Sequence, residues 1–144
     1  MLPVDFVKAL GVALLILVLD LACAFLTVSI WAMLTGQTGL TPMDPKVIEI
    51  SSLSTRICGP LLFALFVWIF QRKRTDRNAW AFAAAVFGFY FLIDAGIAAV
   101  PMEGAPSGSG LAAMMQPEVL GTMALKLVGA LVGAWLARRK VSKR

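Results

Sequence analysis

The chain has 144 residues, of which 60% are hydrophobic and 15% are charged, and its mean hydropathy is +0.86. Soluble domains are about 45–50% apolar and about 25% charged, so this composition excludes a soluble globular protein. Histidine is absent, and the two cysteines, Cys23 and Cys58, do not form a CxxC motif. We therefore expect neither a metal nor another cofactor. The length predicts a single domain over residues 1–144.

Four stretches are long and apolar enough to cross a bilayer, which takes roughly 20 residues of helix. In chain order they cover residues 8–34, 47–70, 79–100 and 117–137. Between the first two, Asp44-Pro45 is typical of an N-cap followed by the first residue of a helix. The predicted fold is all-α: a polytopic membrane protein with a bundle of four transmembrane helices.

The basic residues predict the orientation of this bundle. Nine of the thirteen Lys/Arg residues lie in two segments, 71–78 and 138–144, whereas the loops 35–46 and 101–116 hold one lysine. The positive-inside rule then places both termini in the cytoplasm, and we expect a multi-pass protein of the inner membrane. The expected cytoplasmic anchors are Arg72, Lys73, Arg74, Arg77, Arg138, Arg139 and Lys140.

The net charge of +5 raises the question of a nucleic-acid partner. Topology alone requires this excess of basic residues, and anionic lipid headgroups are the nearest partner for them. We therefore expect contact with headgroups at the cytoplasmic face and no binding of nucleic acid.

Four charged residues fall well within the predicted spans: Asp20, Arg56, Asp94 and Lys126. An ionised residue at the centre of a transmembrane helix costs roughly 2.5–3.5 kcal/mol, so such residues usually face the bundle interior and pair. Counting about 1.5 Å per residue from the basic anchors places Asp20 and Lys126 at roughly 18 Å. The same count places Arg56 and Asp94 at roughly 24–25 Å. The depths predict two ion pairs, Asp20–Lys126 and Arg56–Asp94.

Neighbouring residues are suited to support these charges. Tyr90 lies four residues before Asp94, within reach of a hydrogen bond. Pro60 lies four residues after Arg56, where it predicts a kink and a free carbonyl. Gly129 and Gly133 share the face of Lys126 in a GxxxG spacing, which permits close packing within the bundle or in a dimer. Cys23 and Cys58 also match in depth, and the sequence leaves open whether they meet.

The sequence leaves three classes of function. The favoured interpretation is a non-enzymatic accessory or assembly subunit that is fastened by its ion pairs and acts through a membrane-protein partner. A homo-oligomer is the other possible state, and it would favour a transport function. The alternative is a small oligomeric transporter or channel that handles protons or cations through Asp20 and Asp94, since intramembrane acids often mark such pathways. An intramembrane enzyme is the third class. Its aspartates would have to share a proton, and Asp20 and Asp94 differ by roughly 7 Å in depth.

Overall fold

A computed structural model describes residues 3–42, 44–73, 78–100 and 109–141. Within these residues the chain is all-α, with four helices that are long and apolar enough to cross a membrane. The long helices are α1 (Pro3–Thr35), α2 (Pro45–Gln71), α3 (Ala79–Ala98) and α5 (Pro117–Val141), and a short helix, α4 (Ser109–Met114), precedes α5. The first helix begins earlier than the predicted residue 8, and the last continues past the predicted residue 137.

Local signals account for the starts of the helices. α2 begins at Pro45, whose fixed φ suits the first helical turn. The side chain of Asp44 does not cap this helix, and it accepts a hydrogen bond from the backbone N–H of Thr41 at 2.6 Å. α3 has a side-chain cap, because Asn78 Oδ1 accepts from the backbone N–H groups of Trp80 and Ala81 at 3.1 and 3.4 Å.

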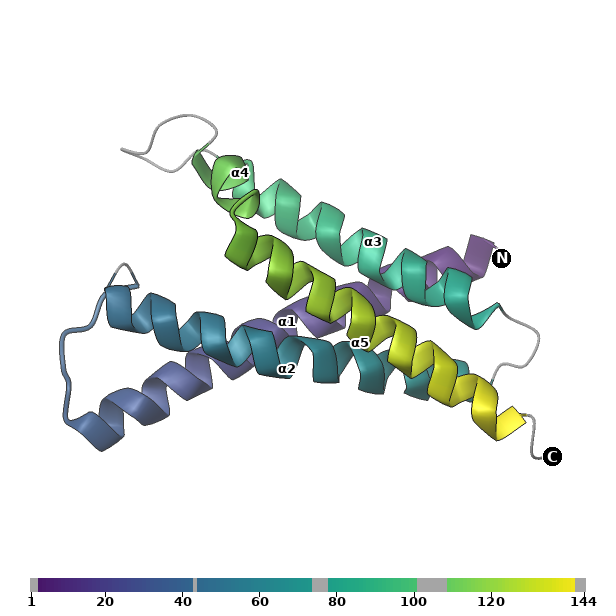
Figure 1. The fold of residues 1–144 in the computed structure, drawn as a ribbon, viewed down its shortest axis with the longest axis horizontal. Coiled ribbons are helices and arrows are strands. Elements are labelled where there is room, and N and C mark those ends of the chain that lie inside the picture. Colours follow the sequence, from purple (N-terminus) through teal and green to yellow (C-terminus); the bar gives the residue numbers. More distant parts are fainter. Residues whose placement is uncertain (1–2, 43, 74–77, 101–108, 142–144) are drawn as a thin grey trace.

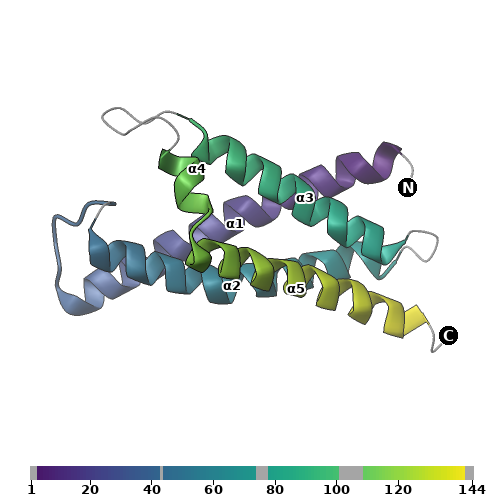
Figure 2. The ribbon, with the colours of Figure 1, turned by 45° about the horizontal axis from the view of Figure 1, so that its top comes forward.

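The four long helices form a ring in the order α1, α2, α5, α3 (Figures 1 and 2). Since successive spans alternate in direction, α2 runs parallel to its neighbour α5, and α1 runs parallel to its neighbour α3. The diagonal helices α1 and α5 have no Cα atoms within 8 Å of each other among the described residues. Both chain termini lie at one end of the bundle, which we call the terminal end, and the opposite end is the loop end (Figure 1).

Most of the packed core lies in the terminal half of the bundle. The largest fully buried side chains, Phe63, Phe82, Ile16, Val12, Val67 and Val86, all lie in this half. On α1, no residue beyond Asp20 is fully buried. Several apolar side chains in this part of the helix are largely exposed, and the exposed fraction is 72–83% at Phe25, Met33 and Leu34. Toward the loop end, α1 and α2 diverge from α3 and α5 (Figures 1 and 2). The core therefore stops near Asp20 on α1, and on α5 it extends to Met123, three residues beyond Lys126 toward the loop end.

Candidate functional site

The predicted ion pair between Asp20 and Lys126 is confirmed, and it lies at the centre of the bundle. Lys126 Nζ donates to Asp20 Oδ2 at 2.7 Å, and the side chains of Lys126 and Asp20 are only 3% and 5% exposed. Charges this deeply buried need a partner, because leaving water costs each of them several kcal/mol. Asp20 of α1 and Lys126 of α5 are each other's partner, although their helices are diagonally opposite in the ring.

Tyr90 of α3 completes a buried triad with this pair. Its hydroxyl accepts a hydrogen bond from Lys126 Nζ at 2.5 Å and donates one to Asp20 Oδ2 at 3.2 Å. Lys126 Nζ also lies 4.6 Å from the centroid of the Tyr90 ring, close enough for a cation–π attraction. The sequence predicted a hydrogen bond between Tyr90 and Asp94 of the same helix, but the hydroxyl donates to Asp20 on the neighbouring helix α1. Three helices, α1, α3 and α5, thus meet at one polar cluster.

A glycine on the fourth helix makes room for the lysine. A Cβ atom built on Gly59 of α2 would lie 2.6 Å from Lys126 Cε, so no other residue fits at that position without displacing the lysine stem. Two further glycines, both on α5, lie along the same contact between α2 and α5. Cβ atoms on Gly129 and Gly133 would overlap the carbonyl oxygens of Pro60 and Ala64. The GxxxG spacing of α5 therefore packs against α2 within this bundle, with α2 helical through Pro60.

Asp94 lies one turn beyond Tyr90 on α3, toward the loop end. It is partly buried, and it is close enough to Lys126 and Asp20 to interact with both electrostatically. The remaining oxygen of Asp20, Oδ1, is buried and has no hydrogen-bond partner among the described groups. The cluster thus contains one basic and two acidic side chains, with one acceptor oxygen left open.

The predicted ion pair between Arg56 and Asp94 is wrong. Arg56 Nη2 lies 3.4 Å from Oε2 of Glu118, at the start of α5, with side chains 40% and 81% exposed. Two physical reasons explain the error. Side chains tilt toward the N-terminus of their helix, which carries the guanidinium of Arg56 toward the loop end. In addition, α2 and α3 face each other diagonally, whereas α2 and α5 are neighbours.

Glu118 is therefore the partner that the sequence analysis missed. One feature of the sequence could have indicated this pair. Glu118 lies near the predicted start of the last span, at the end of the bundle that an extended Arg56 side chain reaches. The two residues border an open groove of about 350 Å³, which is also lined by Pro117, Gly121, Thr122 and Leu125.

The two cysteines meet on neighbouring helices. Cys23 of α1 and Cys58 of α2 are free thiols, and they lie close enough to interact with each other. One turn farther toward the loop end, the hydroxyls of Thr27 and Ser54 lie 3.0 Å apart. These polar contacts join α1 to α2 where the apolar core has already ended. No group of three or more Cys, Asp or Glu side chains in the described part of the chain is arranged to hold a metal ion.

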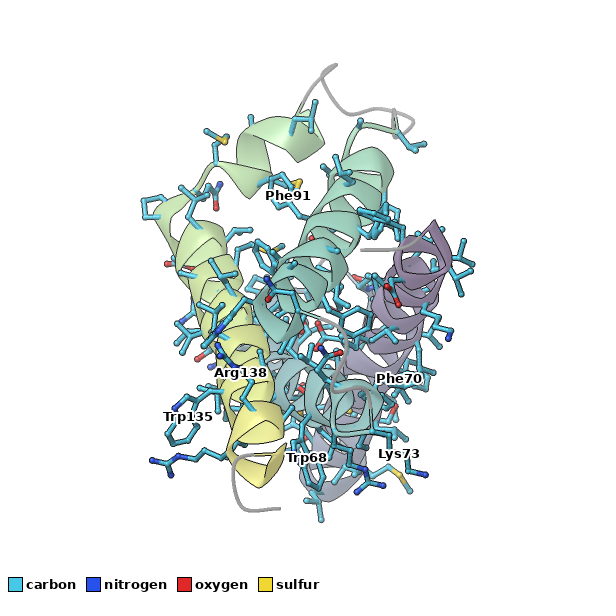
Figure 3. The ribbon with its side chains drawn as sticks, turned by 90° about the vertical axis from the view of Figure 1, so that its right-hand side faces the viewer. Trp68, Phe70, Lys73, Phe91, Trp135 and Arg138 are labelled. Atoms are coloured by element: carbon cyan, nitrogen blue, oxygen red, sulfur yellow. The ribbon has the colours of Figure 1, made fainter. Side chains whose placement is uncertain are left out.

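The basic anchors that the structure describes lie near the terminal end. Arg72, Lys73, Arg138 and Arg139 are exposed there, and Figure 3 shows Lys73 and Arg138 at this end. Arg74 and Arg77 lie outside the described residues, as does the side chain of Lys140.

Comparison with models of protein families, with curated protein sequences and with solved structures finds no match to this chain. Its function must therefore be inferred from its own residues.

Proposed function

We propose that this chain is a non-enzymatic subunit of a membrane-protein assembly, and that its Asp20–Lys126 pair fastens the helices of the bundle. The observation that carries this proposal is the mutual neutralisation of the two charges at 2.7 Å in a site that is almost fully buried. The pair is also the direct link between α1 and α5, whose backbones stay apart. Buried charges can specify which helices come together, because any other arrangement leaves a charge unpaired.

The loop half of the bundle supports an accessory role. There the helices α1 and α2 extend beyond the start of α5 (Figure 1). Many of their apolar side chains in this half are exposed. Helices of a partner can pack against such faces, since association within a bilayer depends on side-chain packing and interhelical hydrogen bonds. The packed half would then hold the subunit together while the loop half contacts the partner.

A double-mutant cycle on the ion pair tests this proposal. Lys126→Met leaves Asp20 buried without a cation, which should lower the free energy of unfolding by about 3–5 kcal/mol. Adding Asp20→Leu removes the orphaned charge and should restore stability to within about 1 kcal/mol. Lys46→Met, at an exposed lysine of the loop end, is the control and should leave stability nearly unchanged. Unfolding in mixed detergent micelles measures each variant.

The same variants, tagged and expressed at native level, test the assembly. We expect a stoichiometric membrane-protein partner to copurify with the wild type and with the stable double variant. A double variant that stays unstable would contradict the fastening role. A chain that purifies only as copies of itself would contradict the accessory role.

A second candidate function is the handling of protons or cations by Asp20 and Asp94 in a small oligomeric transporter or channel. The open acceptor Asp20 Oδ1 favours it, together with the second carboxylate of Asp94 one turn nearer the loop end. In this case Asp20→Asn and Asp94→Asn should leave the fold intact and abolish proton or cation flux into liposomes. Flux that is absent from wild-type liposomes, or equal in the variants, would exclude this candidate.

A further inference from the structure

Among the described residues, Asp94 of α3 forms neither a hydrogen bond nor an ion pair. Lys126 interacts with it electrostatically, but the close contacts of Lys126 Nζ are Asp20 Oδ2, at 2.7 Å, and the hydroxyl of Tyr90. Asp20 Oδ1 is buried and also lacks a hydrogen-bond partner within the described part of the chain. The cluster therefore contains two acidic groups for one basic group, and its acceptor oxygens exceed the donors that the described residues supply.

Asp94 lies about one helical turn from the middle of the bundle. Asp20 is near the middle of α1, and the hydroxyl of Tyr90 reaches it from α3. Asp94 follows Tyr90 by four residues, which is about 6 Å along the helix. An ionised side chain inside a bilayer is costly unless it is paired, and such residues usually face a partner. Asp94 therefore needs a cation that the described residues do not place beside it.

The helices on either side of Asp94 have no buried face toward the loop end. None of the residues 21–35 of α1 and none of the residues 91–100 of α3 is fully buried. Large apolar side chains are exposed on both segments, with exposed fractions of 72% at Phe25 and 65% at Leu92. In this half α1 also diverges from α3 (Figures 1 and 2). Two neighbouring helices thus leave apolar faces uncovered beside an unpaired acid.

Charge complementarity indicates what covers these faces. The occupant has to carry a positive charge at the depth of Asp94. In the described spans, the intramembrane cations of this chain already have partners, because Lys126 pairs with Asp20 and Arg56 pairs with Glu118. A second copy of these spans therefore brings no unpaired cation to this depth. A helix of another protein that carries a lysine or an arginine would neutralise Asp94 and cover the apolar side chains.

We propose that the loop halves of α1 and α3 form a docking site for a transmembrane helix of the partner protein, and that a lysine or arginine near the middle of that helix pairs with Asp94. This inference rests on the proposed role as a subunit and names the chemistry of the contact. The charge provides specificity, because a helix without a basic residue leaves Asp94 unpaired. Packing against the exposed apolar side chains provides the remaining attraction.

Binding of synthetic transmembrane helices to the full chain in phosphatidylcholine vesicles tests the site. The probes are leucine–alanine peptides of about 21 residues that differ only at the central position, which is Lys, Gln or Asp. Energy transfer from a donor dye on the chain to an acceptor dye on the peptide measures binding. We expect the wild type to bind the Lys peptide roughly 10-fold more tightly than the Gln peptide, and the Asp peptide less tightly than either. A fourth peptide, with its lysine moved two turns toward one end, should lose the preference.

Asp94→Asn assigns this preference to a single carboxylate. The substitution keeps the size of the side chain and removes the charge, so the Lys and Gln peptides should bind equally well. The matched control is Glu49→Gln, which removes an exposed acidic side chain of the loop end and should keep the preference. Equal binding of the Lys and Gln peptides to the wild type, or a preference that survives Asp94→Asn, would overturn the proposal. The comparison of peptides on the wild type requires no variant to fold.

The native complex separates this inference from the proposed function. A partner that copurifies with the wild type should be lost from Asp94→Asn and retained by Glu49→Gln, and its spanning segments should contain a lysine or arginine. A partner that stays bound to Asp94→Asn would overturn the docking site and leave the role as a subunit standing. Absence of a partner from the wild type would contradict that role, whereas the peptides would still decide the docking site. Self-association that Asp94→Asn and Arg56→Gln both abolish would assign the site to a second copy and overturn the proposal.

Discussion

The terminal half and the loop half of this bundle contrast sharply in how they hold together. In the terminal half, glycines bring α2 and α5 into backbone contact, and aromatic side chains fill the centre, with Phe63 and Tyr90 packed edge to face at 5.1 Å. In the loop half the helices diverge, and the described contacts between α1 and α2 include hydroxyl and thiol groups. The Asp20–Lys126 pair lies at the boundary between the two halves.

This difference shows where a membrane bundle obtains its stability. Lipid is as apolar as the side chains it surrounds, so burial of leucine does not by itself drive the helices together. Close packing and buried hydrogen bonds do, and both are concentrated in the terminal half and at its boundary. Substitutions that keep the Asp20–Lys126 ion pair should therefore lose effect in the order packed half, boundary, loop half.

The largest effect is expected at Gly129, in the packed half. Gly129→Leu drives a side chain into the carbonyl of Pro60, and because backbone cannot move aside, the free energy of unfolding should fall by about 3 kcal/mol or more. The control is Gly121→Leu on the same helix, where a Cβ atom meets nothing within 4 Å, and its effect should stay below about 1 kcal/mol. Unfolding in mixed micelles compares them. Equal effects would remove the distinction between the two halves.

An intermediate effect is expected at Tyr90, on the boundary. Tyr90→Phe keeps the ring but removes the hydroxyl that links Lys126 to Asp20, while the direct ion pair remains. Hydrogen bonds to charged groups contribute about 1.5–3 kcal/mol, and we expect a loss near the lower limit. Measured in the Lys126→Met/Asp20→Leu background, the same substitution should cost much less. An unchanged cost there would show that the hydroxyl does not act through the ion pair.

The smallest effect is expected at Arg56, in the loop half. Its pair with Glu118 is partly exposed and 3.4 Å long, and exposed pairs contribute about 0–1 kcal/mol. Arg56→Gln should therefore change the stability by less than about 1 kcal/mol, and Glu118→Gln should do the same. A loss as large as that of Lys126→Met would mean that Arg56 holds the bundle together as the buried pair does.

Residue depth was predictable from the sequence, whereas lateral neighbours were not. Counting along each helix correctly matched Asp20 with Lys126, because both lie near the middle of their apolar spans and both needed a partner. The same counting wrongly matched Arg56 with Asp94, since depth does not reveal that their helices are diagonal. It also could not show that Tyr90 reaches Asp20 in place of the nearer Asp94, because that depends on how α3 is rotated toward α1.

The sequence by itself determined the four apolar spans, their approximate bounds and the need for a partner at each buried charge. These properties depend on composition and on the rise of a helix, which are local. Only the tertiary structure decided the ring order of the helices, the contact of Cys23 with Cys58, and the packed and open halves. Those features depend on which faces fit together, and here a few glycines that allow backbone contact between α2 and α5 set the arrangement.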